Sequence, residues 1–202
     1  MLKSSPTHSC LLLAAAVSEP TQLLKQRLLE LLGPAIAHFT RNALLYELPL
    51  AFRGCIALGQ GLLEDGIFVG QAIDEAAENY ERADAACVWL LDDARDAVES
   101  ISPESRTGYW FLHNVPLVER KRKKGEAAVR QTLVVNPCGP TPTREDHNKL
   151  SNRMCLAFDR GEHASREDVQ RKRQLTLHFL EECSRASKDW YSERGFPNAQ
   201  TC

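Results

Sequence analysis

The chain has 202 residues, of which 43% are hydrophobic and 26% are charged, and its formal net charge is −2. This length supports one domain with an extension and can bury a sizeable core. The balanced charge excludes a general attraction to nucleic acid or to a membrane surface, so any such attraction must be local. No apolar run approaches the roughly 18 residues that a membrane span needs.

Residues 11–17 form a short apolar run that follows Lys3. The run resembles the core of a secretory signal peptide, but seven residues lie at the low end for such a segment and the polar residues before it fit poorly. We therefore favour a degenerate strand of a sheet over a signal peptide.

Seven cysteines are scattered along the chain without a C-x-x-C pair. Their odd number, and the apolar surroundings of Cys55 and Cys87, favour free thiols in a reducing cytosol over a disulfide framework or a metal site. We expect a cytoplasmic protein.

Residues 21–46 have leucines at three- and four-residue spacing with charged residues between them, which predicts an amphipathic helix. Thr21 suits its start. Gly33 and Pro34 predict a break into two helices, because proline inside a helix removes a hydrogen bond and clashes with the preceding turn.

Residues 50–91 organise the rest of the chain. We predict a strand over 52–58, a glycine-spaced turn, a short strand end at 67–69, a helix from Gln71 and a second strand over 85–91. This order is typical of an α/β layer. Gly70, placed directly before the helix, allows the backbone to approach a ligand or another chain closely.

The remaining elements follow from periodicity and from the glycines and prolines. We predict a short helix over 91–100 capped by Asp92 or Asp93, a strand over 109–118 that Pro116 restricts to an edge or a bulge, and a returning strand over 131–136. Prolines and a glycine in 137–143 mark a boundary between residues 1–137 and a helical C-terminal extension, residues 138–202.

The runs RGCIALG (53–59) and IFVGQAIDEAAENYE (67–81) resemble the second half of a class III nucleotidyl cyclase domain, most closely its divergent bacterial branch. The runs VPLVERKRKKG and TLVVNP resemble the last hairpin of that domain, and RQLTLHFLEE resembles a closing helix. The resemblance implies a ferredoxin-like α/β fold, with an antiparallel sheet, helices packed on one face and the first strand missing.

The same resemblance implies a chemistry. Class III cyclases convert a nucleoside triphosphate into a 3′,5′-cyclic nucleotide and pyrophosphate, using two Mg²⁺ or Mn²⁺ ions between two subunits. We find no metal-binding aspartates here: the first would precede Met1, and residues 11–19 contain no aspartate. The chain therefore looks truncated or degenerate, and whether it is an enzyme stays open.

The resemblance also places candidate site residues. The family's catalytic asparagine and arginine fall on Asp74 and Glu78, which share a helix face. Candidate substrate-binding positions are Arg53, Ile67 and Gly70, with Ile67 replacing a base-recognising aspartate. Arg53 could contact phosphate, although an ion pair with Asp74 or Glu75 is the simpler expectation.

Three functions remain open. The first is a nucleotidyl cyclase-like protein, related to enzymes that make cyclic pyrimidine nucleotides in antiviral defence. The second is a non-catalytic dimerising or regulatory module, as a homodimer or with another cyclase-like chain. The third is nucleic-acid binding through the five consecutive cations of residues 120–124, for which a solvated turn is the simpler interpretation.

Overall fold

The computed structural model describes residues 21–65, 67–102, 108–123, 125, 128–140, 143–160 and 163–193. Their helices are α1 (Gln22–Leu45), α2 (Gln71–Asn79), α3 (Asp92–Glu99), the 3₁₀-helix η1 (Glu119–Lys121), α4 (Arg144–Phe158) and α5 (Glu167–Glu193). The strands are β1 (Gly54–Ile56), β2 (Leu62–Glu64), β3 (Ile67–Val69), β4 (Val88–Leu90), β5 (Trp110–Pro116) and β6 (Val129–Val135). The run 11–17, predicted as a strand, lies outside these residues.

Four strands form one mixed sheet in the order β1-β4-β6-β5. β1 and β4 are parallel, and β4–β6 and β5–β6 are antiparallel. The two runs predicted as strands over 52–58 and 85–91 therefore pair with each other, although each contributes only three residues to the sheet. β5 is an edge strand that ends at Pro116, which confirms the edge position predicted from that proline.

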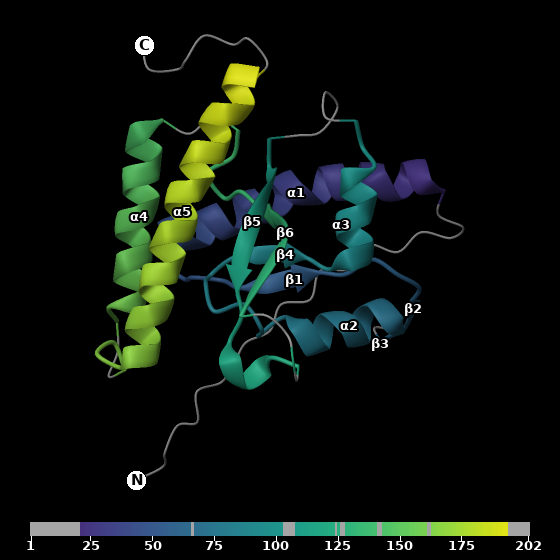
Figure 1. The fold of residues 1–202 in the computed structure, drawn as a ribbon, viewed down its shortest axis with the longest axis horizontal. Coiled ribbons are helices and arrows are strands. Elements are labelled where there is room, and N and C mark those ends of the chain that lie inside the picture. The colour runs from purple at the N-terminus through teal and green to yellow at the C-terminus, as the bar shows by residue number, and fades with distance from the viewer. Residues whose placement is uncertain are drawn as a thin grey trace.

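Helices cover both faces of this sheet (Figure 1). α1 and α3 pack on one face, in a core that includes Leu90 and Leu133, while α4 and α5 pack on the other face around Trp89 and Val134. Because successive strand residues point to opposite faces and both sets here are apolar, both faces need a cover. The expected mixed α/β fold is confirmed, but the sheet is not wholly antiparallel and the helices are not confined to one face.

α1 continues through Pro34, so the predicted break into two helices is wrong. Tertiary packing outweighs the cost of the proline. A Cβ added at Gly33 would lie 2.7 Å from Cζ2 of Trp110, so only glycine lets this buried indole pack directly against the helix backbone. Leu29 and Ala37 are buried on the same helix.

The start of α3 also differs from the prediction. Leu91 is the N-cap and makes no side-chain capping bond, so neither Asp92 nor Asp93 caps this helix. Asp92 lies in the first turn and accepts a 2.6 Å hydrogen bond from Arg130 of β6. Asp92, which the local sequence pattern predicts as a helix cap, instead binds an arginine on a neighbouring strand of the sheet.

The chain between β1 and β4 leaves the sheet as the β2–β3 hairpin, which forms a separate two-stranded sheet, and returns through α2. Gly70 joins the hairpin to α2 at φ +138°, and a Cβ there would lie 2.6 Å from the carbonyl oxygen of Gln60 and from Cα of Gly61. Both the dihedral angle and the space therefore require glycine.

The two C-terminal helices complete the second core. Leu150 and Met154 of α4 and Phe179, Leu180 and Cys183 of α5 are buried there together with strand residues. Thr143 and Asp146 form a capping box that starts α4. None of the helices in the described part of the chain is long and apolar enough to cross a membrane.

Replacing Gly70 with alanine is expected to lower the free energy of unfolding by at least about 2 kcal/mol, because a side chain would be strained at this angle and would contact the backbone of Gln60. Gly54→Ala is the matched control, since a Cβ at Gly54 meets nothing within 4 Å. Denaturant unfolding of the two variants tests this, and equal stabilities would contradict the tight approach at Gly70.

Candidate functional site

The two carboxylates at the predicted catalytic positions lie on the exposed side of α2. Asp74 and Glu78 are both exposed and one helical turn apart. Glu78 lies 3.9 Å from the ammonium of Lys123, beyond the end of η1. Asp74 and Glu78 therefore share one exposed side of α2, with Lys123 beside Glu78.

The predicted substrate-binding residues do not meet in one cavity. Arg53 precedes β1 and donates a 3.1 Å hydrogen bond from Nη1 to the carbonyl oxygen of Ala83, rather than pairing with Asp74 or Glu75. Ile67 lies on the hairpin with 64% of its surface exposed. Gly70 follows the hairpin and contacts the backbone of residues 60 and 61.

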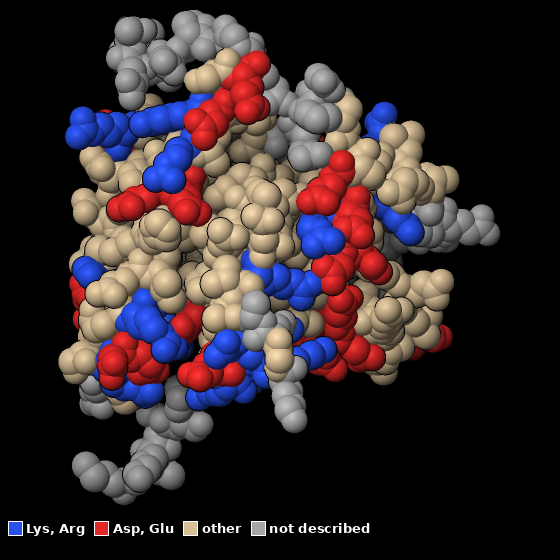
Figure 2. All heavy atoms as spheres, in the orientation of Figure 1, with Lys and Arg blue, Asp and Glu red and all other residues tan. Residues whose placement is uncertain are grey.

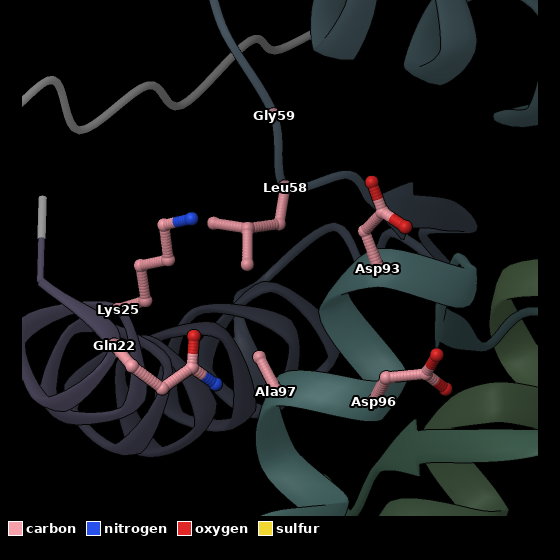
Figure 3. A pocket seen from close by; sticks show the side chains of 7 residues that line it. All are labelled: Gln22, Lys25, Leu58, Gly59, Asp93, Asp96 and Ala97. Atoms are coloured by element: carbon pink, nitrogen blue, oxygen red, sulfur yellow. The ribbon is translucent and has the colours of Figure 1, made fainter.

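A cleft of about 270 Å³ lies where β1 ends and α3 begins, and its seven lining residues are shown in Figure 3. Gln22 and Lys25 come from α1, Leu58 and Gly59 from the segment after β1, and Asp93, Asp96 and Ala97 from α3. In α/β sheets the carboxyl ends of parallel strands are the usual place for a ligand. None of the seven was among the predicted site residues.

The charges around the cleft are largely engaged. Asp96 lies 2.8 Å from Nη2 of Arg95, and Figure 3 shows its carboxylate pointing away from Lys25. The hydrogen bond from Arg130 lowers the pKa of Asp92, against a smaller opposing effect of burial. Lys25 and Asp93 remain without an ion pair to any described residue. The cleft therefore offers one ammonium and one carboxylate, which suits a small polar ligand.

A buried acid–base pair lies between the sheet and α5. His113 of β5 is 5% exposed, and its Nδ1 lies 2.5 Å from Oε2 of Glu182. Its ring packs against Phe111 and Phe179. Burial lowers the pKa of His113, although Glu182 acts in the opposite direction. Burial therefore favours the neutral form of this imidazole, which packs against aromatic rings and does not line the cleft.

The basic run 120–124 is not a free patch in its described part. Lys121 lies 3.0 Å from Glu81, Arg122 lies 3.6 Å from Glu119, and Lys123 pairs with Glu78 as above. Lys124 is not among the described residues. Nucleic-acid binding through this run stays an untested hypothesis.

Five described cysteines are free thiols, in agreement with the prediction. Cys87 is fully buried, and this burial raises its pKa to about 12. The described residues contain no group of three or more histidine, cysteine, aspartate or glutamate side chains placed to hold a metal ion.

Comparison with known proteins finds no matching family model, no matching curated protein and no matching solved structure.

Acid should destabilise the protein through His113. Because its folded pKa lies below the value of about 6.5 in an unfolded chain, the unfolded state takes up the proton first. Stability is fully present above that unfolded value and falls as the pH drops through the folded pKa, by at most about 1.4 kcal/mol per pH unit. Denaturant unfolding between pH 7.5 and 5 should show this fall.

The histidine responsible can be identified by substitution. His113→Gln should flatten the pH dependence, whereas His163→Gln, a change at an exposed histidine that does not contact Glu182, should keep it. Equal slopes in the two variants would show that His113 is not responsible.

Proposed function

We propose that this chain is a nucleotidyl cyclase-like domain that acts by pairing with a second copy of itself and does not form a cyclic nucleotide. The observation that carries this proposal is the apolar outer face of the β2–β3 hairpin. Leu62, Ile67 and Val69 of this hairpin are 57%, 64% and 50% exposed.

The cyclase-like part is supported by the order of elements between β1 and β4. A strand at residues 54–56, a strand at 67–69, a glycine and a helix follow in the order that the resemblance of residues 53–81 implies, although residues 67–69 pair with β2 in a separate hairpin. Gly70 cannot be replaced without strain, which agrees with a specific role for the glycine before the helix. The mixed sheet with helices on both faces departs from the ferredoxin-like form, so the cyclase-like proposal rests on the order of the elements.

The non-catalytic part is supported by the charge of α2. Where the family has an asparagine and an arginine that orient the ribose and neutralise the transition state, this helix exposes Asp74 and Glu78. Two carboxylates at these positions would repel the developing negative charge of a triphosphate. The substitution thus removes an attraction and adds a repulsion.

The pairing part follows from the geometry of the hairpin. In the register of β2 and β3, Leu62 lies opposite Val69 and Ile67 opposite Glu64, so the three exposed aliphatic residues share one face with the carboxylate of Glu64 at its end. An isolated two-stranded hairpin is at best marginally stable in water. A second copy would present the same face, and a two-fold contact between identical hairpins satisfies both surfaces at once.

Introducing a charge on this face should weaken self-association. Ile67→Asp is expected to raise the dimer dissociation constant at least tenfold, because burying an aliphatic side chain contributes about 1.5–3 kcal/mol. Sedimentation equilibrium over a wide range of protein concentration measures this. Leu112→Asp is the control, since Leu112 is 53% exposed on β5 and is not part of the hairpin.

Two results would contradict the pairing. One is a monomer of the unaltered chain at every concentration, and the other is an equal effect of the two substitutions.

No cyclic nucleotide should form from any of the four nucleoside triphosphates in the presence of Mn²⁺, because Asp74 and Glu78 repel the negative charge that develops on the attacked triphosphate. Chromatography of the reaction products after prolonged incubation checks this. A cyclic product whose yield scales with protein concentration, and which is lost when Asp74 is changed to alanine, would overturn the non-catalytic assignment while leaving the pairing untouched.

A further inference from the structure

Residues 82–86, the segment before β4, contact both the chain that leads into η1 and the helix α5. The amide of Asp84 donates a 2.7 Å hydrogen bond to the carbonyl oxygen of Pro116, and the amide of Val118 donates a 2.8 Å bond to that of Arg82. These bonds attach the segment that leads into η1. The first turns of α5 lie on the other side, because the hydroxyl of Thr176 accepts a 2.8 Å bond from the amide of Ala86.

Cations from separate elements converge on this segment. Arg53 donates to the carbonyl oxygen of Ala83, as described above, and Nη2 of Arg171 lies 2.8 Å from Oδ2 of Asp84. Lys172 is the next residue of α5, and its carbonyl oxygen accepts a 2.7 Å bond from Thr176, which fixes this turn of the helix. Arg120 follows from η1. We call Arg53, Arg120, Arg171 and Lys172 the basic cluster.

Positive charge is in excess within the basic cluster. Burial lowers the pKa of Lys172, and Arg53 and Arg120 lower it further, whereas Asp84 and Asp168 act in the opposite direction. Of these carboxylates, Asp168 is held by two 3.0 Å hydrogen bonds from Arg166. The side chain of Asp84 is 6% exposed, and its Oδ1 has no hydrogen-bond partner among the described residues.

Glu81, a further carboxylate that interacts with Arg53, lies 3.0 Å from Lys121. Asp84 is therefore the carboxylate left to the four cations of the basic cluster. Like charges held together cost free energy unless an anion neutralises them. Figure 2 shows lysine and arginine side chains over the lower end of α5 and around η1, interspersed with carboxylates. The side chain of Arg171 is 53% exposed, so a ligand can reach the basic cluster from solvent.

We propose that the basic cluster binds the phosphate group of a small anionic ligand. Guanidinium groups bind phosphate oxygens in pairs, and a phosphate dianion supplies the negative charge that Asp84 alone does not. The basic cluster lies beside residues 83 and 84, which precede β4, and includes no residue of the β2–β3 hairpin. Phosphate binding and self-association are therefore independent proposals.

Thermal unfolding at pH 7 tests the site, with sodium phosphate compared against sodium chloride at equal ionic strength. Phosphate should raise the melting temperature of the unaltered chain in a saturable way. Lys172→Gln should raise the phosphate concentration for half-maximal effect at least tenfold, because it removes a charge-assisted contact. The same variant should be at least as stable as the unaltered chain without phosphate, since it relieves the crowding of cations.

Lys188→Gln is the matched control, because Lys188 is an exposed lysine of the same helix, four turns beyond the basic cluster. This variant should respond to phosphate as the unaltered chain does. An equal effect of chloride, or equal responses of the two variants, would overturn the proposal.

The same thermal unfolding experiment with uridine monophosphate distinguishes inorganic phosphate from a phosphate ester as the ligand. Half-maximal stabilisation at a similar concentration of the two ligands identifies the bare phosphate group as the ligand. A lower concentration for the nucleotide, lost in Lys172→Gln, identifies a phosphate ester bound through the same site. Nucleotide stabilisation that Lys172→Gln leaves unchanged would contradict the assignment.

Discussion

The parallel pairing of β1 and β4 is the constraint on which the rest of the fold depends. Backbone hydrogen bonds at its two ends run from the amide of Gly54 to the carbonyl oxygen of Cys87 and from the amide of Leu91 to the carbonyl oxygen of Ile56. Since parallel strands cannot be joined by a tight turn, the chain must leave the sheet after β1 and come back along its side. The β2–β3 hairpin and α2 are this excursion, and so the hairpin stands outside the sheet with an apolar face uncovered.

The C-terminal helices give this arrangement its second layer and its buried polar groups. α5 brings Phe179 and Glu182 against His113, and it carries Lys172 to the segment before β4. α5 thus covers the core, contacts the buried imidazole of His113 and contributes two residues to the basic cluster. These three roles depend on the same packing, so a shift of α5 would change all of them.

Local patterns in the sequence predicted much of this fold. The strands within 52–58 and 85–91, the helix from Gln71 and the edge position of Pro116 follow from turn residues and apolar runs. The β2 strand and the parallel pairing of residues 54–56 with 88–90 were not predicted. The continuity of α1 through Pro34 does not, because it depends on an indole 76 residues away in a strand. Asp92 was assigned to a helix start for the same reason: Arg130, which holds it, is distant in sequence.

The candidate sites were harder to predict than the fold. Arg53 was predicted as a candidate substrate-binding residue, but its interaction with Lys172 joins residues 119 positions apart. His113 and Glu182 lie in segments whose local patterns carry no sign of each other. A glutamate at the helical spacing of the buried face of α5 was the only available signal.

Hydrogen exchange of the hairpin amides at several protein concentrations tests the central claim most directly. If the uncovered face pairs with a second copy, the amides of residues 62–64 and 67–69 should be protected at high concentration and should exchange faster on dilution. The amides of β5 and β6 should be unaffected. Hairpin exchange that does not depend on concentration would contradict the account.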